Sequence, residues 1–356
     1  MTPKTRIKTA LEHKEPDRVP IGYVTTREAK QNLKQFLNIE NDEELFKRIG
    51  FDYRNVFPEY IGPKDLLLDF NWDYAGKDIW GVERRNVKNA FGGHREISLY
   101  PLKDIKDVEE LEKYPWPKIE WFDFDSLNRQ IDALNQDDEY YIILSGGSVF
   151  EQSWYMRGFE QFLIDFMVSP DIANKIMEKN FNFWSSIVHE SMKAAKGHID
   201  MVFFGDDIAS QEGMLMSAET WRKMIKPWHK RFYDISHMYG KKTLYHSCGS
   251  LEPIIEDLIE IGLDVLNPLQ FSAKNFPSSE KLKEKYGSRL CFLGGMDIQS
   301  VLPFYSVEEI KKETERLIKS LGKDGGFILQ TTHMIQADTP PEKIIAMYDT
   351  ALKYTY

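Results

Sequence analysis

The stretch that decides the fold is residues 198–249, in which two apolar segments flank a helical one. The segments are HIDMVFFGDD (198–207) and KKTLYHSCG (241–249), and helical periodicity occupies residues 218–240 between them. Strands that are apolar throughout and alternate with helices indicate a parallel sheet covered on both faces. This stretch therefore predicts a strand-helix-strand unit of an α/β protein.

The same alternation continues on both sides of this unit. Further strands are predicted over four apolar segments, each followed by a helical pattern: 140–147, 263–270, 289–297 and 325–333. A short strand at 19–23 and one strand from the less regular region would bring the total to eight, which predicts a (β/α)8 TIM barrel. A doubly wound open sheet is the alternative, but no GxGxxG motif follows the first strand.

Residues 24–135 follow the pattern less closely. They combine helical stretches at 28–37 and 42–49 with aromatic segments such as FNWDYAGKDIWGVERR (70–85), which suggests a hairpin or an insertion. We therefore expect one barrel domain over residues 1–356, with an N-terminal helical and irregular extension.

Bulk composition narrows the functional class. The 356 residues carry a formal net charge of -10, which argues against unassisted binding to nucleic acid phosphates. No apolar run reaches the roughly 20 residues that span a bilayer, and the N-terminus has no apolar signal core. Two cysteines cannot build a disulfide framework. These observations predict a cytoplasmic, reduced protein with neither a membrane nor a nucleic acid as partner.

Polar residues collect where the predicted strands end. In barrels of this type the chemistry lies at the carboxyl ends of the strands, so we expect these side chains to converge on one mouth. They are Glu151, Gln152, Asp206, Asp207, His246, Cys248, Asn267, Gln270, Asp297, Gln330 and His333.

His246 and Cys248 are the most specific members of this set. Residues two apart in a strand point to the same side, so a His and a Cys at this spacing can form half of a zinc site. With His333 they make the best trio of ligands. The alternatives are a buried Cys with a hydrogen-bonded His, and a loop His at position 333. Cys291 lies inside an apolar strand, and we expect it in the core.

Glu151, Asp206 and Asp207 are candidates for a fourth ligand or a proton donor. Adjacent carboxylates raise the pKa of one of them, which would supply a general acid. Capping of the next helix is the alternative for Asp206 and Asp207.

Aromatic and apolar side chains suit a pocket for a flat substrate. The candidates are Tyr23, Trp80, Trp154, Tyr155 and Met156, and ordinary core packing is the alternative for each. Asn267, Gln270 and Asp297 are the polar candidates for substrate binding.

Five segments together resemble the uroporphyrinogen decarboxylase superfamily, and the similarity covers essentially the whole chain. They are LEHKEPDRVP, GDDIASQEGMLMSAETWRKMIKP, KKTLYHSCGS, LGGMD and GGFILQTTHMIQADTPPEKI. The resemblance implies a (β/α)8 barrel. True decarboxylases carry an arginine-rich segment of the type RQAGRYLPEY, whose arginines bind substrate carboxylates. The equivalent stretch here is IGYVTTREAKQNLKQF, which argues against decarboxylation of a porphyrinogen.

The other branch of the superfamily contains zinc-dependent methyltransferases that work with corrinoid proteins. In members that methylate coenzyme M, the zinc ligands are an HxC pair and a later Cys. His246 and Cys248 match the pair, and the later Cys falls at His333 here. A Cys to His change keeps a good zinc ligand.

The resemblance therefore implies transfer of a methyl group from a small methylated substrate, with a methoxylated aromatic favoured, to a corrinoid (cobalamin). The chain has no DxHxxG motif, so the corrinoid is expected on a separate protein. The alternatives are a metal-independent decarboxylase, a thiol-methylating enzyme of the coenzyme M type and a non-catalytic ligand-binding protein. The oligomeric state stays open, a homodimer included.

Overall fold

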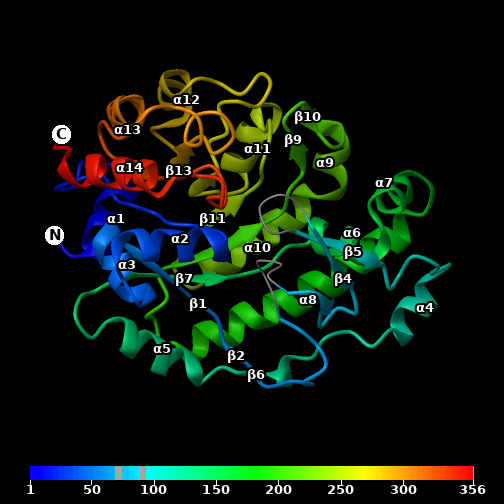
Figure 1. Cartoon of the computed structure of the whole chain (residues 1–356). Coiled ribbons are helices and arrows are strands. Elements are labelled where there is room, and N and C mark those ends of the chain that lie inside the picture. Colours follow the sequence, from blue (N-terminus) through cyan, green and yellow to red (C-terminus); the bar gives the residue numbers. More distant parts are fainter. Residues whose placement is uncertain (69–73, 89–93, 356) are drawn as a thin grey trace.

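Seven parallel strands form the central sheet of the computed structural model, which describes residues 1–68, 74–88 and 94–355 (Figure 1). Every neighbouring pair is parallel. In sheet order the strands are β1 (Tyr53–Val56), β7 (Tyr141–Ser145), β8 (Met201–Gly205), β11 (Lys242–His246), β12 (Val265–Asn267), β13 (Cys291–Met296) and β14 (Phe327–Thr331). The six strands predicted from residue 140 onward are thus confirmed, and β1 is the strand expected from the less regular region.

The segment around Ile21 joins the two edges of this sheet. The amide of Gly22 donates to the carbonyl of Leu329 in β14 at 2.8 Å, and the amide of Asp52, beside β1, donates to the carbonyl of Ile21 at 3.0 Å. The predicted strand at 19–23 is therefore present as a single parallel bridge between Ile21 and Leu329. This closure confirms the (β/α)8 barrel class.

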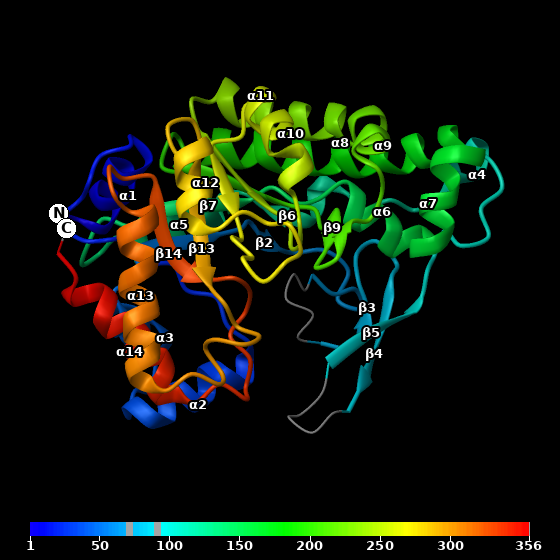
Figure 2. The same cartoon turned by 90° about the horizontal axis from the view of Figure 1, so that it is seen from above.

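Helices cover the outside of the barrel in the order that the sequence predicts. The helix α1 (Pro3–Leu11) begins with Thr2, whose side chain caps the helix, and with a Pro in its first turn. The others are α8 (Pro170–Ala194), α9 (Ala218–Met224), α10 (Lys226–Met238), α11 (Ile255–Glu260), α12 (Ser279–Tyr286), α13 (Val307–Leu321) and α14 (Pro341–Lys353). Figures 1 and 2 show the two termini side by side at one end of the molecule.

One predicted helix is two helices in the structure. The single helix expected over 218–240 is divided into α9 and α10 at Ile225. Pro227 lies in the first turn of α10 and has no amide to donate to a preceding turn, so it begins a helix and cannot continue one.

The region between the first bridge and β7 contains helices and small antiparallel sheets. Its helices are α2 (Arg27–Leu37), α3 (Asp42–Ile49), α4 (Val108–Lys113) and α5 (Ser126–Leu134). One sheet pairs β2 (Glu59–Tyr60) with β6 (Phe122–Asp123), and another contains β3 (Gly76–Lys77), β4 (Glu83–Val87) and β5 (His94–Leu99). The hairpin expected within 70–85 is the β3–β4 pair, and residues 70–73 lie outside the described residues. In Figure 2 this sheet projects beyond the barrel strands, apart from α13 and α14.

Two further helices and a short hairpin complete the mouth of the barrel. The helices α6 (Phe150–Arg157) and α7 (Phe159–Val168) follow β7, and β9 (Ala209–Ser210) and β10 (Gly213–Met214) form the hairpin after β8. None of the helices in the described part of the chain is long and apolar enough to span a bilayer.

Candidate metal centre

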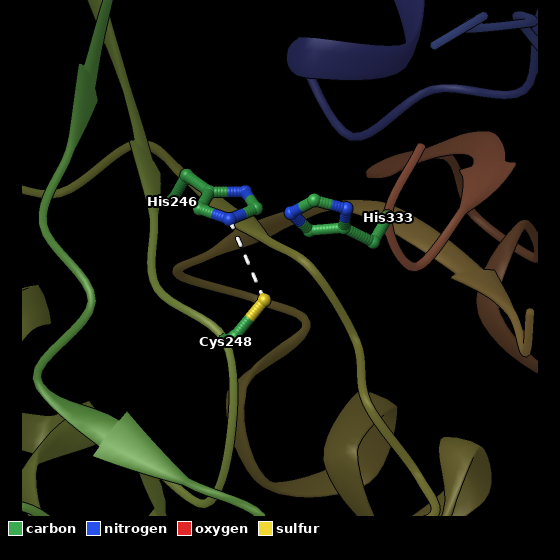
Figure 3. A group of neighbouring side chains, drawn as sticks. All are labelled: His246, Cys248 and His333. Carbon is green, nitrogen blue, oxygen red and sulfur yellow. Dashed lines mark hydrogen bonds between the residues drawn. The ribbon is translucent and has the colours of Figure 1, made fainter. Parts of the chain in front are cut away.

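The structure brings His246, Cys248 and His333 together at the mouth of the barrel. Their donor atoms all lie within 4.8 Å of one another. Figure 3 shows the two imidazole rings and the thiol pointing toward a common point, and Cys248 Sγ lies 3.6 Å from His246 Nε2. His246 is the last residue of β11 and His333 follows β14, so strands that are far apart in the chain contribute to the same cluster.

The backbone around Cys248 is fixed by two neighbouring loops. The amide of Cys248 donates to Asp207 Oδ1 at 2.7 Å, and the amide of Gly249 donates to Gln270 Oε1 at 2.7 Å. Gly249 has φ +90°, and a Cβ there would lie 2.4 Å from the carbonyl oxygen of Ser210. Only glycine fits this contact, so the turn after β11 is held against β9 with the thiol facing the two histidines.

Asn267 fixes the orientation of the His246 ring. Its amide nitrogen donates to the carbonyl of Leu293 at 2.9 Å, which leaves its Oδ1 facing His246 Nδ1 at 2.6 Å. Because Oδ1 can only accept, Nδ1 carries the ring proton and Nε2 keeps its lone pair. A ligating His commonly has its other ring nitrogen held in this way, so the arrangement suits a metal on Nε2.

The donor set fits zinc. Burial, followed by the neighbouring His246, lowers the pKa of His333 to about 4, so its imidazole is neutral at physiological pH. Burial, followed by the charge of Asp207, raises the pKa of the Cys248 thiol well above its usual range. Two imidazoles and one Cys, which binds metal as a thiolate, are a typical three-ligand set for a zinc site with an open position. Metal binding itself stays a prediction.

Asp206 is tied into the scaffold. Its carboxylate accepts three backbone amides at the start of α6 at 2.8–3.1 Å, from Val149, Phe150 and Glu151. It also lies 2.9 Å from Nε2 of His229, and both side chains are buried. The capping alternative therefore accounts for Asp206. The helix that Asp206 caps is α6, which precedes it in the chain, and not the helix that follows it. The contacts leave Asp206 facing α6, which contradicts its predicted role as metal ligand or proton donor.

Asp207 and Glu151 lie closer to the trio. Asp207 Oδ1 is 3.6 Å from His246 Nε2. Glu151 accepts a hydrogen bond from the hydroxyl of Tyr155 at 2.5 Å. Burial, reinforced by the charge of Asp207, raises the pKa of Glu151 well above its usual range. The raised pKa favours the protonated carboxylic acid, which is the form that can donate a proton.

Two cavities adjoin His246. A larger one of about 440 Å³ occupies the barrel interior, and a smaller one of about 230 Å³ lies toward the β3–β5 sheet. His246, Ser145 and Phe203 line both. His246 thus stands at the boundary between the two cavities, and His333 lines the larger one only.

The predicted substrate-binding residues divide between these cavities and the scaffold. Tyr23 and Asn267 line the larger cavity, and Trp80 and Tyr155 line the smaller one. The other four line neither cavity: Trp154, Met156, Gln270 and Asp297.

Each of these four has a structural contact instead. Trp154 packs against Tyr155 and Phe159 with ring centroids 4.2 and 5.3 Å apart, and Met156 is fully buried in the core. The Gln270 side chain accepts the Gly249 amide, and Asp297 Oδ1 accepts backbone amides of the loop after β13. The core alternative describes Trp154 and Met156, and the contacts of Gln270 and Asp297 hold neighbouring backbone in place.

Sequence reasoning missed several residues of the site. Those that line the smaller cavity include Asp78, Arg84 and Trp184. Gln152, one of the polar residues expected after the strand at 140–147, lies next to Glu151 on α6 and lines the same cavity. Asp78 and Arg84 come from the β3–β4 region, where no strand end marks them. No sequence pattern marked His229 as a partner of Asp206, because a single His within a helical pattern is common.

Comparisons with known proteins agree with this architecture. The family described as uroporphyrinogen decarboxylase (URO-D) matches residues 94–354. No curated protein matches the sequence. Among solved structures, a methyltransferase from Methanosarcina mazei is similar with a TM-score of 0.68 and 18% identity, over 99% of each chain. A B12-independent methionine synthase from Shewanella sp. W3-18-1 is more distant, with a TM-score of 0.45 and 11% identity over 96% of this chain and 95% of the other. The chain therefore belongs to the uroporphyrinogen decarboxylase family.

Proposed function

We propose that the protein is a zinc-dependent methyltransferase that moves a methyl group from a small methoxylated aromatic to the corrinoid of a separate protein. The observation that carries the proposal is the convergence of His246, Cys248 and His333 within 4.8 Å, beside two cavities. Family membership and the shared fold of the Methanosarcina mazei methyltransferase support it.

The ligand set favours an oxygen substrate over a thiol. His246, Cys248 and His333 would hold the zinc, which supplies Lewis acidity to a substrate heteroatom when bound. One thiolate and two imidazoles donate less negative charge than two thiolates and one imidazole. The metal is then more electrophilic, which suits polarisation of an ether oxygen, and we place the protein on the methyl-donor side of the cycle.

The protein's own residues supply the proton and the orientation. In the proposed reaction the C–O bond of the donor breaks, the methyl group passes to the cobalt(I) corrinoid as co-substrate, and the leaving oxygen takes a proton. Glu151 is the proposed acid, because its raised pKa favours the protonated form and Tyr155 holds one of its oxygens. Asn267 keeps the ring of His246 in the orientation that the metal requires.

The test combines metal content with a spectroscopic assay. The purified protein should contain stoichiometric zinc and should convert a cobalt(I) corrinoid to methylcobalt in the presence of a methoxylated aromatic. A metal-free, folded protein without methyl transfer would refute the proposal. Release of CO2 from an aromatic acid by chelator-treated protein would favour the decarboxylase alternative.

Glu151→Gln tests the proposed acid. We expect a drop in turnover of about 100-fold or more, within the range for loss of general acid catalysis, and unchanged zinc content. For the unmodified protein the rate should fall as pH rises through the raised pKa of Glu151, because the protonated form is then lost. Glu160→Gln, an exposed position on α7, is the control. A pH profile that is the same in Glu151→Gln would exclude Glu151 as the acid.

A further inference from the structure

The smaller cavity has the size and the walls of a site for one aromatic ring. Its volume is about 230 Å³, and an engineered cavity of roughly 150 Å³ in another protein binds benzene. Trp80 and Trp184 line it and stack on each other with centroids 5.4 Å apart. Tyr155 and Phe203 add two more aromatic walls. A planar, apolar ligand would therefore keep aromatic contacts on several sides.

Two residues that line this cavity each have a buried hydrogen-bond donor with no acceptor within the described protein. The donors are Nε2 of Gln152, whose side chain is 7% exposed, and Nε1 of Trp80, which is 5% exposed. A buried donor without an acceptor costs free energy, and native proteins seldom keep one without a reason. An oxygen acceptor on a bound ligand would satisfy these donors.

The charges of the cavity are already balanced. Arg84 is the one Lys or Arg among its described lining residues, and its Nη1 is 2.7 Å from Asp78 Oδ2. Asp78 Oδ1 also accepts the amides of Trp80 and Val82. Asp207 lies nearby and adds negative charge. A carboxylate ligand would lose its hydration here without gaining a cationic partner, so a neutral ligand is favoured.

We propose that the smaller cavity binds the methyl donor as a neutral planar ring that carries a second oxygen acceptor, with Gln152 as a specificity-determining residue. This inference rests on the proposed function and divides the two cavities between the two substrates. Because His246 lines both cavities, a ring in the smaller one places a substituent beside the trio, and the larger cavity is left for the methyl acceptor.

Titration calorimetry on the full chain tests the site without any methyl transfer. The probes are 2-methoxyphenol, methoxybenzene, which lacks the second oxygen, and 3-methoxybenzoate, which is an anion. We expect 2-methoxyphenol to bind about 3- to 10-fold more tightly than methoxybenzene, as one hydrogen bond allows, and 3-methoxybenzoate to bind most weakly.

Variants assign the effect to Gln152. In Gln152→Leu the advantage of 2-methoxyphenol over methoxybenzene should disappear, and in Trp80→Phe, which keeps a ring but removes the N–H, it should shrink. Gln35→Leu, an exposed glutamine on α2, should behave as the unmodified protein. Absent binding of 2-methoxyphenol, tighter binding of 3-methoxybenzoate, or an advantage that survives in folded Gln152→Leu would each overturn the inference.

The two proposals fail separately. Gln152-dependent ring binding without methyl transfer would refute the proposed function and retain the ligand site. Methyl transfer whose KM for 2-methoxyphenol is the same in Gln152→Leu would retain the proposed function and overturn the ligand site.

Discussion

Both cysteines of the chain lie beside a histidine, at opposite ends of the barrel. Cys248 Sγ is 3.6 Å from His246 Nε2 at the carboxyl end of β11, and Cys291 Sγ is 3.7 Å from His13 Nε2 at the start of β13. The first pair has a third donor, His333, and two adjoining cavities. The second pair has neither within the described residues.

The second pair also has a positive charge beside it, whereas the first pair has the carboxylate of Asp207. The Cys291 thiol is 3.7 Å from the carbonyl of Leu11, and burial raises its pKa to about 12. Burial and the positive charge of Lys283 lower the pKa of His13. The comparison teaches that a Cys–His contact becomes a candidate metal site only where the ends of parallel strands bring a third donor and leave space for a ligand.

The largest expected effect is on metal content. Cys248→Ala and His246→Ala should each lose stoichiometric zinc, whereas Cys291→Ala and His13→Ala, the matched pair at the other end, should retain it. Elemental analysis of the purified variants measures this. Equal zinc content in all four variants would show that the His246–Cys248 pair is no more a zinc site than the His13–Cys291 pair.

Metal removal should distinguish the two thiols next. In the zinc-loaded protein neither thiol should react quickly with an alkylating reagent, because one is ligated and the other is buried. After chelation Cys248, which is partly exposed, should become modified, and Cys291 should react only on unfolding. Peptide mass spectrometry identifies the modified residue. Faster labelling of Cys291 than of Cys248 in the chelated protein would contradict the comparison.

A smaller effect is expected from the residue that orients His246. Asn267→Leu removes the acceptor for Nδ1 and should weaken zinc binding by about 10- to 100-fold, the usual cost of losing such a partner. Competition with a chromophoric chelator gives the affinity. Asn128→Leu, which removes a hydrogen bond to Ala194 away from the site, is the control and should leave the affinity unchanged.

The smallest effect concerns stability at the other end. Cys291→Ala removes a buried sulfur and should lower the free energy of unfolding by about 1 kcal/mol, in the ordinary range for a buried side-chain truncation. Urea denaturation measures the change. If Cys291→Ala lost zinc as well as stability, the Cys291 end of the barrel would be coupled to the metal centre, which we do not expect.

The barrel was predictable from the sequence because its strands are buried on both faces. Segments such as YYIILSGG and RLCFLGGMD are apolar throughout, and this pattern does not depend on the neighbours that the strand acquires. The strand around Ile21 was harder to predict, since it contributes one bridge and is held partly by the Asp52 side chain. Pro227 marks the break at Ile225 in the sequence. The helical periodicity continues on both sides of this Pro, and it therefore predicted a single helix.

The candidate site was predictable where it depends on local geometry. The spacing of two between His246 and Cys248, at the end of an apolar strand, indicated a shared direction, and an apolar strand around Cys291 indicated a core position, which is confirmed. Asp206 shows the limit. Its carboxylate binds the start of α6, a helix from earlier in the chain, and no local pattern records that contact.

The sequence by itself determined the barrel class, the HxC pair and the family, because strand periodicity and motif spacing act over a few residues. Only the tertiary structure decided which carboxylate is buried as an acid, that His246 stands between two cavities, and that Gln152 and Trp80 line one of them, each with a buried donor that has no acceptor within the described protein. These features depend on residues far apart in the chain that meet when the sheet closes. Burial, which sets both the pKa of Glu151 and the cost of an unsatisfied donor, exists only after that closure.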